Sequence, residues 1–464
     1  MSAEIDRIRK VIKITNEISP TFCLAKWHHT SIYLHTGQTH SCYHPRPHDI
    51  PLEEIKINPA ALHNTPEKKK ERALMLVGEK PKGCQYCWNV EGLSDTHISD
   101  RHDRNANIYK PERLEEIVNS PWDYNINPEY IELAFSNECN FKCGYCHPMS
   151  SSSFQSEIKQ FGPYETVKNH TLNIEWFKPY QEEENPYIEA WWRWWPEVSK
   201  TLNILRITGG EPLMHKSTWR LFEHLRAEPK PHLELNLNSN FGLTPRHIDR
   251  LCENINDLVD NKKIKTFKVF SSMDTWNNRA EYLRTGLDTK LWESNLDTYI
   301  TKTKAPISIM CTFNILSVTS FTDFLQKVLE WREKYQPILN PTGYGRKIRF
   351  DTPYLKEPLQ YDMLILPKET YLPYFDKILK FIDDNRNEVD PTKFTDMEYE
   401  KFRRVRDYFA TKEYDAERVK EGRIDFYNWF TEYDKRRGTN FLETFPEMES
   451  FWKLCKELAE EKKT

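Results

Sequence analysis

The sequence predicts an α/β fold: a partial β/α barrel of six units, with a cysteine-rich β-hairpin domain before it and a helical region after it. Three observations support this prediction. Short β-rich runs alternate with helical patterns in the middle of the chain, cysteines gather in its first third, and apolar residues recur at helical spacing toward its end. The expected boundaries are 1–125 for the cysteine-rich domain, 126–360 for the barrel and 361–464 for the helical region.

Composition narrows the class of protein. The chain has 464 residues, which allows two or three domains, and it contains 14 Trp, 23 Tyr and 24 Phe, whereas disordered chains are poor in aromatics. The net charge of −4 shows no basic excess, so we expect no nucleic-acid partner. The N-terminus is charged, and no apolar run approaches the roughly 20 residues that span a bilayer. We therefore expect a cytoplasmic protein with no membrane partner.

The β-rich runs predict the barrel. They are 130–136, 202–208, 233–238, 266–272, 307–314 and 347–351, and the clearest helical patterns between them are 218–228 and 321–335. Strands that alternate with helices form βαβ units and a parallel sheet. Six units are too few for a closed eight-stranded barrel, so we expect an incomplete or modified one, similar to part of a TIM barrel.

The helical region begins after Pro367. After it, apolar residues recur at helical spacing: Tyr371, Phe375, Ile378, Leu379 and Ile382. A proline just upstream of such a pattern is typical of a helix start. The aromatic-rich segment 427–458 continues the helical region. We expect this aromatic stripe to pack in a core.

A loop with three cysteines follows the first β-rich run. The segment NECNFKCGYCHP places Cys139, Cys143 and Cys146 in the spacing C-x3-C-x2-C, at the strand end where barrel enzymes hold their chemistry. A structural zinc site needs a fourth ligand, and His147 is poorly placed to supply it because it adjoins Cys146. Three thiolates suit a four-iron, four-sulfur cluster that leaves one iron open for an exchangeable ligand.

This spacing, with Tyr145 just before the last cysteine, resembles the signature of the radical S-adenosylmethionine (SAM) superfamily. The resemblance implies that Cys139, Cys143 and Cys146 hold a [4Fe-4S] cluster whose open iron chelates SAM, with Tyr145 at the cofactor. In that superfamily an electron from the cluster cleaves SAM to methionine and a 5′-deoxyadenosyl radical, which abstracts hydrogen from a substrate.

Further segments resemble the SAM-binding motifs of the same superfamily. ITGGEPL, which follows the second β-rich run, resembles the Gly-Gly-Glu-Pro motif that contacts the SAM amino group, and it assigns Gly209, Gly210 and Glu211 to the cofactor. The two glycines lack a Cβ atom, so backbone carbonyls can approach the ligand there. Glu211 can fix the end of the strand.

Strand ends farther along the chain supply the remaining SAM contacts that the resemblance implies. Ser272 and Arg284 keep the twelve-residue spacing of a Ser and an Arg that lie near the ribose and carboxylate of SAM, although a strand-end Ser and a surface Arg remain the alternative. The residues expected to line the adenosine pocket are Asn238, Ser239, Asn314 and Leu316.

Four more cysteines lie near the N-terminus. The alternating run HTSIYLH, the turn TGQT and a return to Cys42 predict a β-hairpin in which Gly37 adopts a positive φ, and this hairpin brings Cys23 toward Cys42. The pair Cys84 and Cys87 follows in GCQYC. Four thiolates from a hairpin and a C-x2-C turn can close a tetrahedral shell.

The spacing C-x13-G-x4-C resembles the auxiliary-cluster module called the twitch or SPASM domain. In most of that group the module follows the barrel, whereas here it precedes it, so its position relative to a substrate cannot be carried over. We expect an auxiliary [4Fe-4S] cluster on Cys23, Cys42, Cys84 and Cys87, with a structural zinc ion and unmetallated cysteines as alternatives.

Other patterns have simpler interpretations. We expect WWRWWP (191–196) to be a helix that packs its aromatics, with a stacking platform as the alternative, and Cys252, Cys311 and Cys455 to be buried apolar residues. His40, His44 and His48 could bind metal but are expected to be solvated loop residues. Zinc-protease, P-loop and dinucleotide fingerprints are absent from the sequence.

The expected function is therefore that of an oxidoreductase-type radical SAM enzyme with an auxiliary cluster that accepts or relays electrons. The resemblance implies a peptide or protein substrate first, a small alcohol or sugar second, and an electron donor such as flavodoxin or ferredoxin. No residue of this sequence is assigned as a radical acceptor or proton base. The rival hypothesis is a zinc-stapled binding protein whose cysteines are purely structural.

Overall fold

The computed structural model describes residues 3–92, 98–167, 171, 179–180, 182–335 and 346–462. The chain divides into two compact units. The first unit consists of Met1–Ser136, Lys178–Gly209 and Ala227–Asn236, and the second of Asn137–Phe177, Gly210–Arg226 and Leu237–Thr464.

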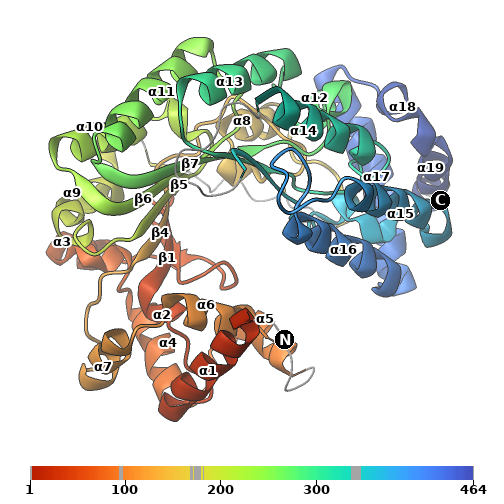
Figure 1. The fold of residues 1–464 in the computed structure, drawn as a ribbon. Helices are drawn as coiled ribbons and strands as arrows, with labels where there is room; N and C mark the ends of the chain where they lie inside the picture. The colour runs from red at the N-terminus through yellow and green to blue at the C-terminus, as the bar shows by residue number, and fades with distance from the viewer. Residues whose placement is uncertain are drawn as a thin grey trace. The chain divides into compact units, whose positions relative to one another are not determined.

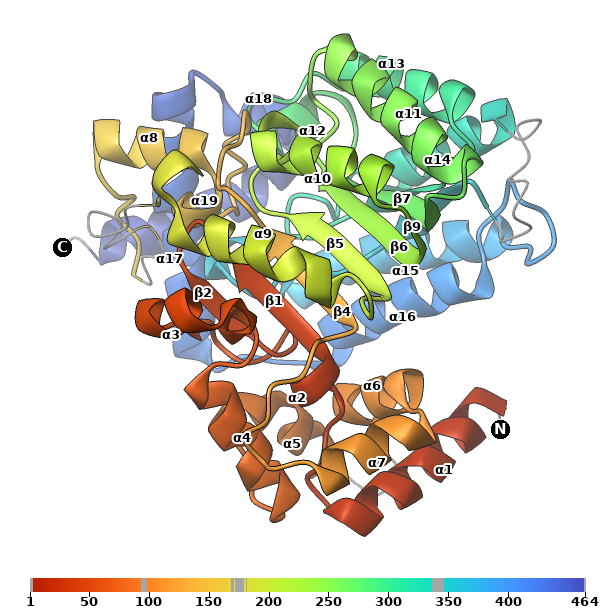
Figure 2. The ribbon, with the colours of Figure 1, turned by 90° about the vertical axis from the view of Figure 1, so that its left-hand side faces the viewer.

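The strands of the first unit pair in both antiparallel and parallel fashion. The strands are β1 (His29–Tyr33), β2 (Gln38–His40), β3 (His48–Asp49), β4 (Tyr130–Ala134) and β5 (Ile204–Thr208). β1 and β2 pair antiparallel as the predicted hairpin (Figure 2), and Gly37 in its turn has φ +70°. β1 also pairs in parallel with β4, and β4 with β5. The hairpin is therefore continuous with the first strand of the predicted barrel, a pairing that the sequence did not reveal.

The first unit also contains helices. They are α1 (Ala3–Ile18), α2 (Ala25–His28), α3 (Leu52–Ile57), α4 (Pro66–Leu76), α5 (Gln85–Glu91), α6 (Asp100–Ile108), α7 (Pro111–Asn119) and α9 (Pro186–Val198). α9 contains the tryptophan-rich run, and Trp191, Trp194 and Trp195 are at most 2% exposed. The expectation that this run packs in a core is confirmed.

The second unit contains parallel strands β7 (Ile264–Ser272), β8 (Ile307–Met310) and β9 (Ile348–Asp351), whereas the residues of β6 (Lys230–Ser239) are divided between the units. The helices between and around these strands in the chain are α8 (Ser152–Phe161), α11 (Pro245–Asp260), α12 (Asn277–Leu283), α13 (Thr289–Lys302) and α14 (Phe321–Tyr335). A further helix, α10 (Lys216–Ala227), precedes β6. Every β-rich run that the sequence indicated contains a strand. The α/β class with mostly parallel strands is confirmed, and closure into a partial barrel remains a prediction.

The C-terminal part of the second unit is helical, as predicted (Figure 1). Its helices are α15 (Lys368–Asp384), α16 (Asp396–Thr411), α17 (Ala416–Arg437), α18 (Phe441–Thr444) and α19 (Glu449–Glu461). α15 starts directly after Pro367 and buries Tyr371, Phe375, Ile378 and Ile382. α17 packs against α19. None of the helices among the described residues has the length and apolar character that crossing a membrane requires.

Candidate functional site

The three-cysteine loop joins the end of β4 to α8. Cys143 is buried, and Cys139 and Cys146 are partly buried. Serines at the start of α8 hold the first cysteine: the Cys139 backbone N–H donates to Ser152 Oγ (3.1 Å), and Ser153 Oγ donates to the Cys139 carbonyl (2.6 Å). Ser151, the N-cap of α8, donates to the Phe141 carbonyl (2.6 Å). The helix start thus fixes the backbone around Cys139.

The middle of the loop is fixed by backbone hydrogen bonds to the last residue of α12 and to the segment that follows it. Lys142 N–H donates to the Thr285 carbonyl (2.9 Å) and Gly144 N–H to the Leu283 carbonyl (3.0 Å). A Cβ atom on Gly144 would lie 2.0 Å from Tyr361 Oη, so only glycine fits between Cys143 and Tyr145. The Arg437 guanidinium, at the end of α17, donates to the Lys142 carbonyl (2.6 Å). The loop is therefore held on several sides.

Nitrogen donors point at two of the three sulfurs. Cys139 Sγ accepts from the Phe141 backbone N–H (3.4 Å) and from Asn240 Nδ2 (3.9 Å), and Cys143 Sγ accepts from Arg284 Nη1 (3.7 Å). Burial and the neighbouring Cys143 raise the pKa of the Cys139 thiol to about 12, and burial likewise raises the pKa of Cys143. Thiolates in this loop therefore need nearby positive charge or N–H donors; Arg284 supplies positive charge at Cys143, and the neutral N–H groups of Phe141 and Asn240 reach Cys139.

The two motif glycines lie against the segment that leads into the loop. Gly209 has φ +118°, and a Cβ atom there would lie 2.5 Å from the Ser136 carbonyl oxygen. A Cβ atom on Gly210 would lie 2.2 Å from the Glu138 carbonyl oxygen, and Glu211 N–H donates to that same oxygen (2.6 Å). The sequence predicted that the missing Cβ atoms let backbone carbonyls approach the ligand. In the structure, the backbone that immediately precedes Cys139 stands where these Cβ atoms would be, and contact of the two glycines with SAM stays a prediction.

Glu211 ties the end of β6 to the motif. Its carboxylate accepts from Ser239 Oγ (3.0 Å) and from the backbone N–H groups of Asn240 (2.6 Å) and Leu213 (3.1 Å). Burial raises the pKa of Glu211 to about 7, although these three hydrogen bonds oppose the shift. Asn240, which sequence reasoning missed, thereby lies where its amide reaches Cys139. Its position one residue after Ser239 was the available signal.

A buried ionic group lies beside Cys143. Arg284 is 6% exposed and Asp274 is fully buried; Arg284 Nη2 donates to Asp274 Oδ1 (3.0 Å), and Tyr145 Oη donates to Asp274 Oδ2 (2.6 Å). The alternative interpretation of Arg284 as a surface residue is wrong. Asp274 was not predicted, although it lies only two residues after Ser272, which is half-buried at the end of β7.

The remaining predicted cofactor residues lie at strand ends. Asn314 and Leu316 lie in the turn after β8 and are fully buried, and the Leu316 backbone N–H donates to Asn314 Oδ1 (3.0 Å). Asn238 is half-buried near the end of β6. The described contacts of Asn314 hold a turn, and contact of these three residues with SAM stays a prediction.

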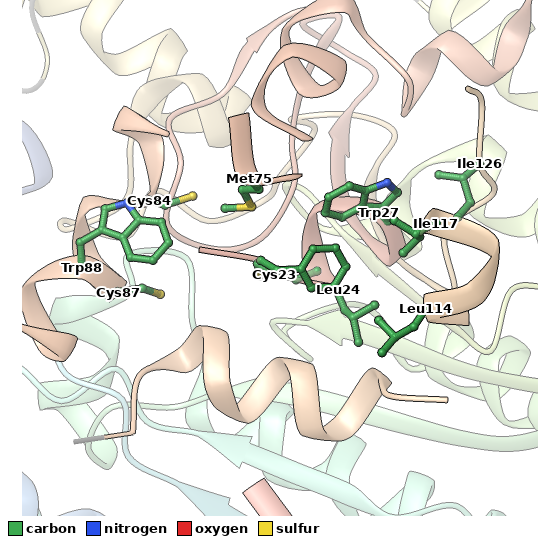
Figure 3. Packing of buried hydrophobic residues seen from close by; sticks show 12 residues of the cluster. Cys23, Leu24, Trp27, Met75, Cys84, Cys87, Trp88, Leu114, Ile117 and Ile126 are labelled. Carbon is green, nitrogen blue, oxygen red and sulfur yellow. The ribbon is translucent and has the colours of Figure 1, made fainter. Parts of the chain in front are cut away.

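The four N-terminal cysteines line one pocket in the first unit. Cys23 precedes α2, Cys42 follows β2, and Cys84 and Cys87 lie at the start of α5. Figure 3 shows Cys84 and Cys87 with their sulfurs directed toward the side on which Met75 and Cys23 lie. The full lining is Cys23, Ala25, Lys26, Ser41, Cys42, Tyr43, His44, Met75, Cys84, Cys87, Asp100, Arg101 and Arg104. The predicted grouping of these four thiols is thus present.

Charged side chains also line this pocket. Lys26, which is 1% exposed, forms an ion pair with Glu71, and Arg101 forms one with Glu91 (2.7 Å). Burial alone would lower the pKa of Lys26, but the charges of Cys84 and Glu71 raise it above its usual value. Burial raises the pKa of the Cys23 thiol to about 12, and Cys42 and Cys84 add to that shift. The four thiols therefore lie close enough to repel one another as thiolates.

The nearby histidines are paired rather than solvated, which corrects the sequence-based expectation. His44 Nε2 lies 2.8 Å from Asp100 Oδ2, and the His44 ring stacks on Tyr86 with centroids 3.9 Å apart. His48 Nε2 bonds Thr65 Oγ1 (2.8 Å), and His40 Nδ1 bonds the Cys42 carbonyl. These rings were expected in open loops, but His48 bonds the N-cap residue of α4, and His44 contacts Asp100 of α6 and Tyr86 of α5.

Two further observations concern cysteines and metals. Cys252, Cys311 and Cys455 are at most 1% exposed, as expected for small buried apolar residues. Within the part of the chain that the structure describes, no three His, Cys, Asp or Glu side chains converge so that they could hold one metal ion. A four-iron cluster binds its cysteines at separate iron atoms, so it does not need such convergence on one point.

Comparison with known proteins finds distant relatives. No protein-family model matches the chain. The chain is 24% identical over 171 residues to GTP 3′,8-cyclase of Nautilia profundicola, covering 35% of this chain and 46% of that protein. It is 22% identical over 185 residues to the Petrotoga mobilis GTP 3′,8-cyclase, covering 39% of this chain and 49% of that protein. It is 24% identical over 171 residues to that of Helicobacter pylori, covering 35% and 46%.

The chain thus spans about half the length of the curated relatives it matches. These relatives support the resemblance to the radical SAM superfamily. Among solved structures, the chain matches anSMEcpe with bound AdoMet and Kp18Cys peptide, at 17% identity and a TM-score of 0.33, covering 55% of this chain and 60% of that one. A TM-score of this size is too low to establish a shared fold.

Proposed function

We propose that this chain is a radical SAM enzyme that holds a [4Fe-4S] cluster on Cys139, Cys143 and Cys146 and binds SAM beside it. When bound, this cluster supplies the electron that cleaves SAM to methionine and a 5′-deoxyadenosyl radical, which abstracts hydrogen from a substrate. The observation that carries the proposal is the three-cysteine loop itself, with N–H donors at two of its sulfurs and Gly210 and Glu211 packed against the backbone at Glu138.

The residues around the loop fit such a cluster. Three cysteines within eight positions provide one thiolate for each of three irons, and they leave the fourth iron to SAM. Arg284 and Asn240 bring N–H groups to the sulfurs, which favours the thiolate form that iron requires. Because Ser152, Thr285 and Leu283 fix the loop backbone, the site needs little reorganisation to load.

The residues of the chain would bind and orient SAM rather than perform the bond cleavage. The proposed contacts are Tyr145, Gly209, Gly210, Glu211, Asn238, Ser239, Ser272, Arg284, Asn314 and Leu316. Arg284 donates from Nη2 to Asp274 and from Nη1 to Cys143, so it would offer its remaining N–H groups to the SAM carboxylate. Glu211 would act by holding Ser239 and Asn240 in place.

We also propose an auxiliary [4Fe-4S] cluster on Cys23, Cys42, Cys84 and Cys87, of the kind found in twitch or SPASM modules. Its support is the pocket that these four thiols share with Lys26, Arg101 and Arg104, whose positive charges suit four thiolates. A structural zinc ion is the alternative occupant, since it also takes four thiolates.

The substrate is a peptide or protein in this proposal, with a small alcohol or sugar as the alternative. The curated relatives are named for cyclising GTP, so a nucleotide is a further class to test. A flavodoxin or ferredoxin would supply electrons. The ten cysteines are free thiols, which suits the reducing cytoplasm where we place the protein.

Anaerobic purification with iron, sulfide and zinc analysis tests the proposal. Two clusters predict about eight irons per chain, and one cluster with one zinc predicts about four. Reduced protein with SAM should release 5′-deoxyadenosine, and Cys143→Ala should abolish this release, whereas Cys252→Ala, a matched change at a buried lone cysteine, should leave it. Release that survives Cys143→Ala would show that the assigned loop is wrong. A chain with zinc, no iron and no SAM cleavage would be the binding protein of the rival hypothesis.

A further inference from the structure

A buried lysine lies at the pocket of the four N-terminal cysteines. Lys26 comes three residues after Cys23 in α2, is 1% exposed, and lines the same pocket as Cys23, Cys42, Cys84 and Cys87. Its ion-pair partner Glu71, in α4, keeps 17% of its side chain exposed. A fully buried ammonium is costly, so a lysine in this place needs an anionic neighbour beyond one partly solvated carboxylate.

The lining of the pocket has an excess of positive charge. Among its charged side chains, Lys26, Arg101 and Arg104 are cationic and Asp100 is anionic. Arg101 is itself 4% exposed and already paired with Glu91. The sulfurs are the remaining groups of this lining that can carry negative charge, and they do so when a metal centre binds them as thiolates.

The charge of such a centre changes when it accepts an electron. Four thiolates outweigh the positive charge of an oxidised iron–sulfur core, so the loaded site is anionic, and each added electron makes it more so. A cation buried beside the sulfurs stabilises the reduced form more than the oxidised form, because the medium around it screens weakly. A zinc ion held by four thiolates is also anionic, so the lysine would stabilise it as well, but zinc accepts no electron and its charge does not change.

We propose that Lys26 raises the reduction potential of the cluster on Cys23, Cys42, Cys84 and Cys87, so that this site accepts an electron instead of serving only as a structural staple. This inference rests on the auxiliary cluster of the proposed function. In the step, one electron passes from a low-potential reductant to the cluster. No bond forms or breaks, and no proton moves, because Lys26 is already an ammonium paired with Glu71.

The test isolates the auxiliary site in the full chain. Cys139→Ala, Cys143→Ala and Cys146→Ala together remove the ligands of the other cluster, and iron and zinc are then measured after anaerobic reconstitution. The potential of the remaining cluster is measured by stepwise reduction with dithionite, followed by electron paramagnetic resonance. Lys26→Gln should shift the potential to a more negative value. Lys26→Arg, which keeps the positive charge, should leave the potential near the parent value.

Two further variants separate an electrostatic role from a structural one. Glu71→Gln removes the negative partner of Lys26 and should shift the potential in the opposite direction, to a more positive value. Lys56→Gln is the matched control, because Lys56 is also paired with a carboxylate, Glu53, but 64% of its side chain is exposed. Solvent screens that pair, so its loss should leave the potential unchanged.

The outcomes distinguish the inference from the proposed function. About four irons in the background variant, with opposite shifts for Lys26→Gln and Glu71→Gln, support the inference. If iron is present and neither variant shifts the potential, or if the parent site resists dithionite, the inference is wrong while the auxiliary cluster stands. If Lys26→Gln does not load iron, the Glu71→Gln variant decides: a shift of the potential to a more positive value supports the inference, and no shift or a negative shift contradicts it. Zinc in place of iron overturns the auxiliary cluster and the inference together.

Discussion

Arg284 and Asp274 form a buried ion pair beside Cys143. Arg284 Nε lies 2.9 Å from Asp274 Oδ2, and the side chains of the two residues are 7% and 0% exposed. The same arginine donates from Nη1 to Cys143 Sγ, and the same aspartate accepts from Tyr145 Oη. One pair therefore connects the strand end after β7 with two residues of the three-cysteine loop.

Asp274→Asn should destabilise the protein and loosen the loop, because it leaves the Arg284 guanidinium buried without a counter-charge. Breaking a buried pair by removing one partner costs about 3–5 kcal/mol. Thermal unfolding of the metal-free protein should show a clearly lower midpoint than the parent. Asp249→Asn breaks the Lys302–Asp249 pair, whose side chains are 56% and 44% exposed, and should change the midpoint little. Equal effects of the two changes would contradict a structural role of the buried pair.

Gly210→Ala should reduce iron binding at the three-cysteine loop. The new methyl group would meet the Glu138 carbonyl oxygen at 2.2 Å and the Asn137 carbonyl oxygen at 2.6 Å, so the backbone that leads into Cys139 must move. Iron per chain after reconstitution, in a variant that lacks Cys84 and Cys87, should fall well below the parent value. Gly92→Ala, where the nearest atom lies 3.2 Å away, is the control and should load normally.

The sequence indicated the strands and the cysteine groups because both depend on local pattern. The runs that became β4 to β9 alternate with helical segments, and C-x3-C-x2-C lies within eight residues, so no long-range information is needed to find them. The parallel pairing of β1 with β4 was missed, because residues 29–33 and 130–134 are far apart in the chain and a hairpin needs no third strand.

Side-chain partners across the second unit were missed for the same reason. Asp274 and Asn240 are ordinary polar residues in the sequence, and only folding brings them to Arg284 and Cys139, which lie in other segments. The packing of Gly209 against the Ser136 carbonyl was also missed, because Ser136 lies in a distant segment of the sequence. The histidines His44 and His48 look solvated in the sequence because their partners Asp100, Tyr86 and Thr65 lie in other segments.

Glu211 should make the stability of the metal-free protein fall as pH rises. Burial raises the pKa of its carboxyl from 4.5 to about 7, so between these values the folded state binds more protons than the unfolded state. The cost of ionising the buried carboxyl is absent below pH 4.5 and complete above about pH 7, where it reaches about 3 kcal/mol. Glu211→Gln removes this titration.

Thermal midpoints of the parent and Glu211→Gln, measured from pH 5 to pH 8, check this sign. The midpoint of the parent should drop relative to that of the variant as pH rises through this range. A constant difference between the two proteins across the range would mean that Glu211 titrates at its ordinary pKa and that its hydrogen bonds to Ser239, Asn240 and Leu213 fully compensate burial.

Cys84→Ala should separate the two cysteine sites. Cys84 lines the pocket of the first unit and contributes nothing to the loop of Cys139, Cys143 and Cys146, which lies in the second. The variant should lose about four irons per chain yet still release 5′-deoxyadenosine from SAM, while turnover of the true substrate is impaired. Cys455→Ala, a change at a fully buried cysteine outside both groups, is the control and should keep both iron and SAM cleavage. Loss of SAM cleavage in Cys84→Ala alone would mean that the N-terminal cysteines serve the same reaction step as the three-cysteine loop.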